Sequence, residues 1–237
     1  MDLKEVGILG PDIGDHWYYR AKALALESYL RDVAFTSVLD VGAGSGYFSR
    51  HLLRNTGARV AYCVDPNYPG ESAESVAGKE LFFVRKVVRS EADLVLLMDV
   101  VEHVDDDSAI IREYAQMCPE NATFLISVPA FQWLWSTHDD FLGHRRRYNL
   151  GTLEAAVMRA GLRVCSCNYY FGAIFPMAAM VRLIRRFTRS GGSATTDLHR
   201  HNRFTNAALL ALCRMELPLL RHNRWFGLSA FCLARRR

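Results

Sequence analysis

Short apolar runs and helical repeats alternate along most of the chain. Seven segments rich in apolar and β-branched residues are typical of strands, at 37–41, 59–64, 79–84, 93–98, 122–128, 162–170 and 228–235. Four segments repeat apolar residues at helical spacing, at 15–32, 47–55, 108–117 and 152–160. Because strands and helices alternate from residue 37 to residue 170, the pattern predicts an α/β fold with helices on both faces of a parallel sheet. Asp15 is the expected N-cap of the first helix.

Residues 171–227 interrupt this alternation and predict a basic, amphipathic helical insertion before the last strand. A helix over 176–189 would place apolar residues on one side, namely Met177, Met180, Val181, Ile184 and Phe187. An arginine stripe would adjoin that side, formed by Arg182, Arg185, Arg186 and Arg189. This pattern is typical of a helix that lies in a membrane interface with its arginines near lipid headgroups. The alternative is a lid helix packed on the sheet, with a solvated basic edge.

Length and composition place the chain among globular proteins. Of its 237 residues, 50% are hydrophobic and 23% are charged, which excludes disordered, collagen-like and coiled-coil chains. A transmembrane helix needs a run of ~18 apolar residues, and the sequence contains none. The first residues do not resemble a secretory signal. We expect a single domain, divided into a helical cap (1–35), a cofactor-binding core (36–170), the insertion (171–227) and the last strand (228–237).

The six cysteines include no CxxC pair, so the sequence predicts neither a disulfide framework nor a zinc site. We therefore expect a cytoplasmic protein without a bound metal. Cys165 and Cys167 lie two apart in a predicted strand, which would place both on the same face as packing residues.

Charge is unevenly distributed along the chain. The formal net charge is +4, but the segment from Arg182 onward holds twelve arginines and two acids, a balance of +10. The preceding residues carry a balance of −6. This asymmetry indicates an anionic partner that one face of the protein contacts, and both a nucleic acid backbone and an anionic membrane fit it.

The strongest local motif lies where the strand 37–41 meets the helix 47–55. An acid, Asp40, precedes alternating glycines in the order Asp40, Gly42, Ala43, Gly44, Gly46. Open α/β sheets bind ligands at this position, and glycines let the backbone approach the ligand closely. Asp65, followed by Pro66, ends the next strand, where a carboxylate can accept hydrogen bonds from both hydroxyls of a ribose. A tight structural turn is the alternative interpretation.

These segments resemble the class I S-adenosylmethionine-dependent methyltransferases. VLDVGAGSG is similar to the first motif of that family, VDPNY to its strand-two motif, and DLVLLMDVVEHVDD to its strand-four motif. The resemblance implies a Rossmann-like, seven-stranded sheet with the last strand antiparallel, and S-adenosyl-L-methionine as cofactor. It implies that the glycine motif holds the methionine end, that Asp65 and Pro66 lie at the ribose, and that Asp99 and Val100 border the sulfur and the substrate. The acid that often contacts adenine in this family is missing from the basic stretch 83–91, so adenine recognition stays unassigned.

Histidines near the expected substrate end are candidates for catalysis. A hydroxyl acceptor needs a proton acceptor near neutral pH, and histidine is the usual one. The candidates are His138, which Asp139 could orient, His144, and His103. Candidate substrate-binding residues are Trp17, Trp133, Trp135, Asp139, Arg146, Arg147 and Tyr148. Packing or capping histidines, a solvated arginine run and lid-core tryptophans are the alternatives.

The segment WSTHDDFLGHRRRY matches the W-S-x-H-D-x-x-L-G-H-x-R-R-Y signature of a bacterial subgroup of these methyltransferases. Many members are encoded among surface-glycan or lipid-modifying enzymes, which implies a small, glycan-type or lipid-linked acceptor, anionic or hydrophobic. We expect no DNA partner. An RNA acceptor is a weaker alternative, because the motif N-P-P-[YF] is missing after the segment that resembles the strand-four motif. A non-catalytic scaffold is the other alternative. The insertion helix adds the inner face of the cytoplasmic membrane as a candidate location.

Overall fold

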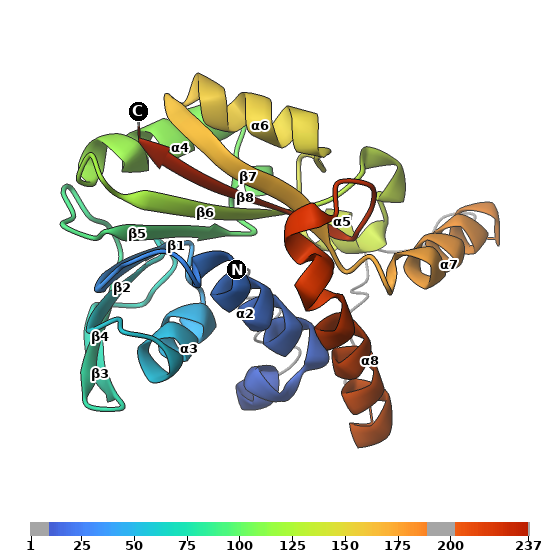
Figure 1. Cartoon of the computed structure of the whole chain (residues 1–237), viewed down its shortest axis with the longest axis horizontal. Coiled ribbons are helices and arrows are strands. Elements are labelled where there is room, and N and C mark those ends of the chain that lie inside the picture. Colours follow the sequence, from blue (N-terminus) through green and yellow to red (C-terminus); the bar gives the residue numbers. More distant parts are fainter. Residues whose placement is uncertain (1–9, 189–201, 237) are drawn as a thin grey trace.

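One mixed sheet organises the chain, which the computed structural model describes over residues 10–188 and 202–236 (Figure 1). The strands are β1 (Ser37–Val41), β2 (Val60–Val64), β3 (Ser72–Val76), β4 (Lys79–Val84), β5 (Leu94–Met98), β6 (Thr123–Pro129), β7 (Leu162–Tyr170) and β8 (Ser229–Arg236). The α-helices are α2 (Trp17–Leu30), α3 (Tyr47–Asn55), α4 (Asp107–Met117), α5 (Thr137–Leu142), α6 (Leu150–Arg159), α7 (Phe175–Thr188) and α8 (Arg203–Glu216). Short 3₁₀ helices are η1 (Gly10–Asp15), η2 (Val101–His103), η3 (Gln132–Leu134) and η4 (Leu217–His222).

The strand order is β3-β4-β2-β1-β5-β6-β8-β7. Strands β4, β2, β1, β5 and β6 run parallel, so their carboxyl ends meet at one edge of the sheet. Strand β8 lies antiparallel between β6 and β7, as expected for the last strand. The predicted Rossmann-like fold with a helical insertion before that strand is confirmed.

The described sheet has eight strands, where the resemblance implied seven. The additional strand, β3, forms a hairpin with β4 through Ala77 and Gly78, which both have positive φ (54° and 76°). Two such residues between paired strands form the tight turn that matches the twist of a hairpin. Four of the five residues of β3 are exposed, so the strand carries no apolar alternation that would have predicted it.

Helices cover both faces of the sheet and create two hydrophobic cores. One core lies between the sheet and α2, α3 and α8, and the other between the sheet and α4 and α6 (Figure 1). All five residues of β5 are buried, because this central strand has a helical layer on each face. The continuous apolar pattern at 93–98 therefore reflects a strand that is buried on both faces of the sheet.

Two local expectations were wrong. The N-cap of α2 is His16, whose Nδ1 accepts a hydrogen bond from the Tyr18 amide at 3.3 Å, whereas Asp15 ends η1. Cys165 and Cys167 do not share a face, because the register between β7 and β8 shifts at Val164 and Ser166. This bulge adds one residue, so Cys165 is exposed while Cys167 is buried.

The insertion between β7 and β8 contains α7, α8 and η4. Helix α8 is tied to the start of α2, since Asn206 accepts from the Trp17 amide at 2.8 Å and donates to the Asp15 carbonyl at 2.7 Å. Helix α7 extends away from the sheet layers (Figure 1). Arg189, the last residue of the expected arginine stripe, lies outside the described residues. Across 10–188 and 202–236, no helix combines the length and the apolar character needed to cross a membrane.

Candidate active site

The glycine motif forms a tight turn between β1 and α3. Gly42, Gly44 and Gly46 have φ values of 62°, 53° and 72°, a left-handed conformation that favours glycine. A Cβ atom on Gly42 would lie 2.8 Å from Cγ2 of Val100, and one on Gly46 would lie 2.9 Å from the Phe83 ring. The turn therefore needs glycine for its conformation and for the space beside it.

Asp40 supports this turn from within the sheet. Its carboxylate is almost fully buried and accepts a hydrogen bond of 2.8 Å from the Ser49 hydroxyl on α3. Burial raises the pKa of Asp40 to about 6. The contact of Asp40 with the methionine end of a cofactor stays a prediction, and the observed bond shows how this acid holds α3 against β1.

Asp65 connects the end of β2 to the glycine turn. One carboxylate oxygen accepts from the Gly44 amide at 3.3 Å, and the other accepts from the Asn67 amide at 2.9 Å. The Tyr68 hydroxyl donates to the Gly44 carbonyl at 2.7 Å, which fixes the same turn from a second side. Pro66, in contrast, is exposed.

These residues fit a nucleoside cofactor. The carboxylate of Asp65 lies beside the glycine turn, where it can accept hydrogen bonds from two hydroxyl groups of a ligand. The hydroxyl of Ser45, within the turn, is buried and has no hydrogen-bond partner in the described chain, so it is available to a polar ligand group. The missing Cβ atoms of Gly42 and Gly46 leave room for Val100 and Phe83, which pack against the turn.

An ion pair with one fully buried member lies at the carboxyl end of β5. Asp99 has φ 55°, an unusual conformation for a residue with a side chain, and its carboxylate pairs with the fully buried Nζ of Lys22 from α2. Ser127 donates to the other oxygen at 3.2 Å. Although burial alone would raise the pKa of Asp99, Lys22 lowers it, and Asp99 in turn raises the pKa of Lys22 against the effect of burial.

Sequence reasoning missed Lys22. A lysine on a helix is usually solvated, and only its position between Ala21 and Ala23 on an otherwise apolar stretch hinted at burial. Glu102 was not among the site residues predicted from the sequence, whereas its neighbour His103 was.

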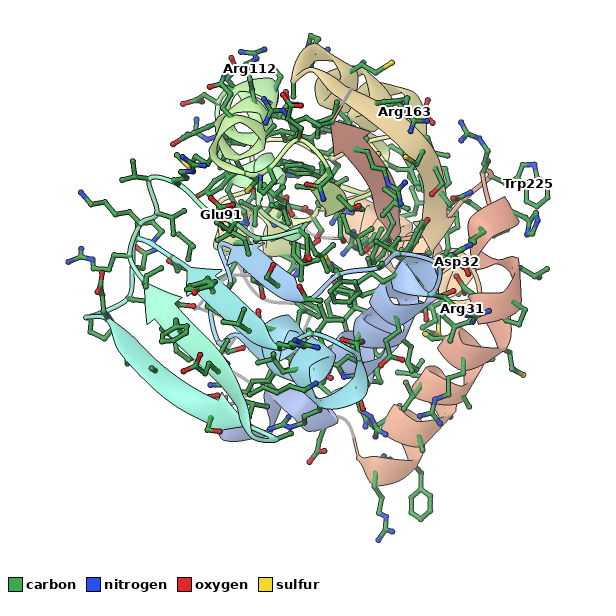
Figure 2. The ribbon with its side chains drawn as sticks, turned by 60° about the vertical axis from the view of Figure 1, so that its left-hand side comes forward. Arg31, Asp32, Glu91, Arg112, Arg163 and Trp225 are labelled. Atoms are coloured by element: carbon green, nitrogen blue, oxygen red, sulfur yellow. The ribbon has the colours of Figure 1, made fainter. Side chains whose placement is uncertain are left out.

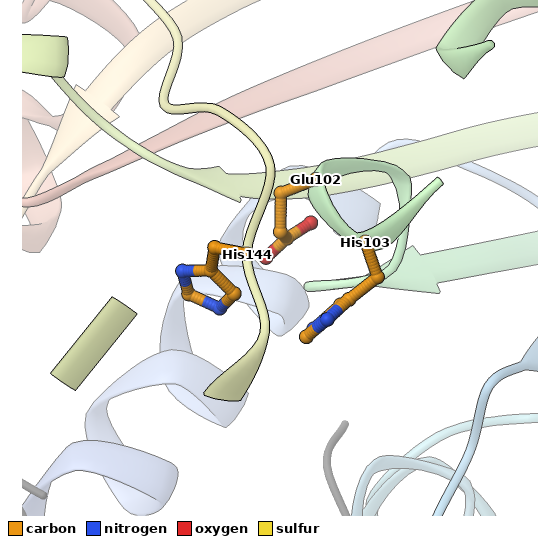
Figure 3. A group of neighbouring side chains, drawn as sticks. All are labelled: Glu102, His103 and His144. Atoms are coloured by element: carbon orange, nitrogen blue, oxygen red, sulfur yellow. The ribbon is translucent and has the colours of Figure 1, made fainter. Parts of the chain in front are cut away.

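Glu102, His103 and His144 converge just beyond β5 (Figure 3). Glu102 and His103 lie on η2, and His144 lies on the loop after α5, with the two imidazole rings edge to face at 4.8 Å between centroids. Glu102 is fully buried, and neither carboxylate oxygen has a hydrogen-bond partner in the described chain. Burial, followed by the charge of Asp99, raises the pKa of Glu102 to about 8.

Asp139 is the hub that orients His144. The carboxylate accepts from Arg147 Nε at 2.7 Å, lies 2.8 Å from Nδ1 of His144, and accepts from the Ser136 amide at 2.8 Å. Burial alone would raise the pKa of Asp139, but His144 and Arg147 hold it below its usual range. Although burial disfavours the imidazolium, the bond to Asp139 raises the pKa of His144. Asp139 and His144 therefore form an acid–histidine pair that the sequence did not predict. His138, which Asp139 was expected to orient, is half-buried on α5, and its catalytic role stays a prediction.

Three further candidate substrate residues serve to hold this segment in place. Arg147 is buried and binds Asp139 through two nitrogens. Arg146 donates to the carbonyls of Val104 and Asp105 at 2.9 and 2.8 Å, and the buried Tyr148 hydroxyl donates to Asp107 at 3.0 Å. These contacts fasten the loop after α5 to the turn after β5, which brings His144 to His103. Substrate binding by Arg146, Arg147 and Tyr148 stays a prediction that these contacts do not favour.

The three candidate tryptophans lie in different surroundings. Trp17 is buried edge-on against Phe171, with a centroid distance of 5.9 Å. Trp133 is about half exposed and packs edge to face on Phe175, the first residue of α7, at 5.8 Å. Trp135 donates from its indole nitrogen to Asp140 at 3.0 Å. Trp133 is thus the member of this set that combines exposure with an aromatic neighbour.

Comparisons with known proteins support the methyltransferase fold. A family model described as a methyltransferase domain matches residues 15–167. A search of curated protein sequences gives no match. The structure is similar to a chain of the complex between the Haloferax volcanii Trm112 methyltransferase activator and its methyltransferase, with 16% identity over 93% of this chain and 89% of that chain and a TM-score of 0.56.

Two further solved structures share the fold. A SAM-dependent methyltransferase from Archaeoglobus fulgidus has 16% identity over 92% of this chain and 96% of that chain, with a TM-score of 0.50. The mitomycin 7-O-methyltransferase has 13% identity over 92% of this chain and 54% of that chain, with a TM-score of 0.52. At these identities the similarity concerns the fold alone.

Proposed function

Because this chain belongs to the methyltransferase domain family, whose cofactor is S-adenosylmethionine, we propose that it methylates a hydroxyl group of a small, glycan-type or lipid-linked acceptor. The observation that carries this proposal is the cluster of Glu102, His103 and His144 beside Asp99 at the carboxyl end of β5. Ligands of open α/β sheets bind at this edge. The cofactor supplies an electrophilic methyl group when bound.

The chain's own residues would orient the two reactants and handle the acceptor proton. Methyl transfer is an in-line displacement, so alignment of the two reactants and exclusion of water supply much of the rate. Asp65 and the glycine turn would hold the nucleoside, while the histidine cluster would activate the acceptor hydroxyl. Trp133, exposed next to Phe175, would offer an apolar surface to a lipid-linked or hydrophobic acceptor.

Cofactor binding is the first test. We expect the chain to bind S-adenosylhomocysteine in calorimetry, and Asp65→Asn to weaken binding roughly 10–100-fold, since hydrogen bonds to a charged group contribute about 1.5–3 kcal/mol. Glu91→Gln, an exposed carboxylate away from the glycine turn, is the matched control. Absence of binding by the unaltered chain would favour the non-catalytic scaffold.

Acceptor class is the second test. The chain is incubated with cofactor labelled in its methyl group and with nucleotide sugars, polyprenyl-linked glycans or total RNA. We expect label in a glycan or lipid fraction and none in RNA. Label in RNA would overturn the proposed acceptor class.

Several arginines of the basic segment weaken the RNA alternative. Arg221 pairs with Asp32 at 2.8 Å and Arg224 pairs with Glu154 at 2.9 Å. Arg182 donates to the Leu134 carbonyl at 2.8 Å and Arg236 to the Cys118 carbonyl at 3.0 Å. These guanidinium groups bind the protein itself, so the charge excess counted along the sequence overstates the basic surface available to a polyanion.

We also propose that α7 contacts a lipid surface. Its apolar side is open, with Met177, Met180 and Ile184 exposed by 53%, 57% and 53%. Phe175 anchors the first turn of the helix on Phe131, Trp133 and Phe226. An anchored first turn followed by exposed apolar residues supports an interfacial helix more than a closed lid.

A further inference from the structure

Three metal-ligating side chains meet at the end of β5. One donor atom from each of Glu102, His103 and His144 lies within 4.8 Å of the others. A tetrahedral ion at about 2.0–2.2 Å from each donor would place the donors roughly 3.4 Å apart. Donors that lie up to 4.8 Å apart would therefore have to approach one another by up to ~1.4 Å to coordinate one ion. Figure 3 shows that they come from two segments, the η2 turn and the loop that carries His144.

Glu102 would give this cluster its negative charge once an ion replaces its proton. Its carboxylate is fully buried and both oxygens lack a hydrogen-bond partner within the described residues. The neighbouring carboxylates are already compensated, Asp99 by Lys22 and Asp139 by Arg147. Buried carboxylates in folded proteins are almost always paired or bound to a metal. Glu102 is therefore the acid that lacks its partner.

His144 already has the surroundings of a metal ligand. Its Nδ1 is bonded to Asp139 at 2.8 Å, which leaves Nε2 as the nitrogen that can coordinate an ion. Metal-binding histidines usually bond a carboxylate or carbonyl through the second ring nitrogen, which fixes the ring and raises its basicity. Asp139 is itself fixed by Arg147 and by the Ser136 amide. The ring of His144 is thus preorganised.

We propose that Glu102, His103 and His144 bind a divalent transition-metal ion of the Zn²⁺ class. Two imidazoles and one carboxylate are a ligand set that suits Zn²⁺, Mn²⁺ or Fe²⁺ better than Mg²⁺, which prefers oxygen ligands and water. Three protein ligands leave at least one coordination position for an exchangeable oxygen. This site departs from the metal-free protein that the cysteine pattern predicted.

The role of the ion, which rests on the proposed function, is to activate the acceptor. A hydroxyl group bound to the ion has a lower pKa and loses its proton to solvent more readily. The resulting oxygen attacks the methyl carbon, a carbon–oxygen bond forms, and the carbon–sulfur bond breaks. The sulfonium thereby becomes a neutral thioether.

Metal binding is tested without cofactor and without acceptor, so the outcome does not depend on the proposed function. The untagged full chain is stripped with a chelator and titrated with Co²⁺, followed by visible absorption, and with Zn²⁺, followed by calorimetry. We expect one ion per chain. Glu102→Gln, His103→Asn and His144→Asn should each weaken binding at least 100-fold.

An exposed histidine outside the cluster provides the matched control. His222→Asn, at the end of η4, should bind Co²⁺ and Zn²⁺ as the unaltered chain does. Circular dichroism and S-adenosylhomocysteine binding report whether each variant folds. Because Glu102→Gln conserves shape and leaves all other contacts in place, it separates loss of the site from loss of the fold. No binding by the unaltered chain, or equal binding by folded Glu102→Gln, would overturn the proposal.

Discussion

Single residues in the glycine turn are constrained for two separable reasons. Gly46 and Gly78 have similar φ values, 72° and 76°, but a Cβ would meet Phe83 at 2.9 Å only at Gly46, while nothing lies within 4 Å of Gly78. Gly78→Ala should cost ~1–2 kcal/mol of unfolding free energy from the left-handed backbone alone. Gly46→Ala should cost a further ~1–3 kcal/mol from overpacking. Urea denaturation measures both, and equal losses would contradict the role of Phe83.

The burial of Asp40 should make stability depend on pH. Its folded pKa of about 6 lies above the ordinary value of ~3.9, so the folded chain holds this proton more tightly than the unfolded chain. The contribution of Asp40 to the unfolding free energy is therefore complete at low pH, and it is lost as the pH rises from about 4 through about 6. The unfolding free energy of the unaltered chain relative to Asp40→Asn should fall by ~3 kcal/mol over that range.

This prediction is checked by urea denaturation of both chains in matched buffers, without cofactor. The comparison with Asp40→Asn cancels the titration of the other groups. A difference that stays constant with pH, or that grows as pH rises, would show that Asp40 is not held in an apolar environment.

At the scale of elements, one ion pair docks α2 on the sheet. Lys22 is fully buried and reaches Asp99 across 77 residues of sequence. Asp99→Asn leaves the fully buried Lys22 without its anion and should cost ~3–5 kcal/mol of unfolding free energy. Lys22→Met leaves Asp99, whose side chain is 24% exposed, without its cation and should cost less. The double variant has no unpaired charge and should recover part of this loss. A double-mutant cycle measures the coupling, and strictly additive losses would contradict a direct pair.

The same pair shows what the sequence could and could not reveal. Helices and strands followed from apolar periodicity because each period is a local property, and α3, β4 and β7 begin and end at the predicted residues. Lys22 has no such signal, since its burial arises only when α2 meets β5. Strand β3 was missed for the related reason that an exposed edge strand needs no apolar pattern.

The candidate site divides in the same way. The glycine turn and Asp65 are adjacent to strand ends, so their proximity followed from the predicted topology. The pairing of Asp139 with His144 depends on the turn at Gly143, which has φ 77° and carries the chain back toward the carboxylate. The sequence pointed to His138 because His138 is adjacent to Asp139, and adjacency cannot show that the chain turns back at Gly143.

On the scale of the whole molecule, net charge and surface charge differ. The basic quarter of the sequence suggested an anionic partner, but Arg221 and Arg224 form ion pairs with Asp32 and Glu154 at the surface. Exposed apolar side chains are the more specific surface feature. They lie on α7 and also on α8 and η4, at Phe204, Met215 and Leu219, and Trp225, 76% exposed, projects from the loop before β8 (Figure 2). A lipid surface accepts such side chains, whereas a hydrated RNA backbone does not.

Helix α7 should therefore determine membrane binding. The double variant Met180→Glu/Ile184→Glu places two carboxylates on the exposed apolar side, which removes apolar burial of about 1.5–3 kcal/mol per side chain and adds repulsion from anionic lipid. We expect co-sedimentation with vesicles rich in phosphatidylglycerol to fall at least fivefold. Val88→Glu, at a residue 83% exposed between β4 and β5, is the matched control and should sediment as the unaltered chain does. Equal sedimentation of all three chains would contradict membrane binding through α7 and would favour the alternative of a lid helix.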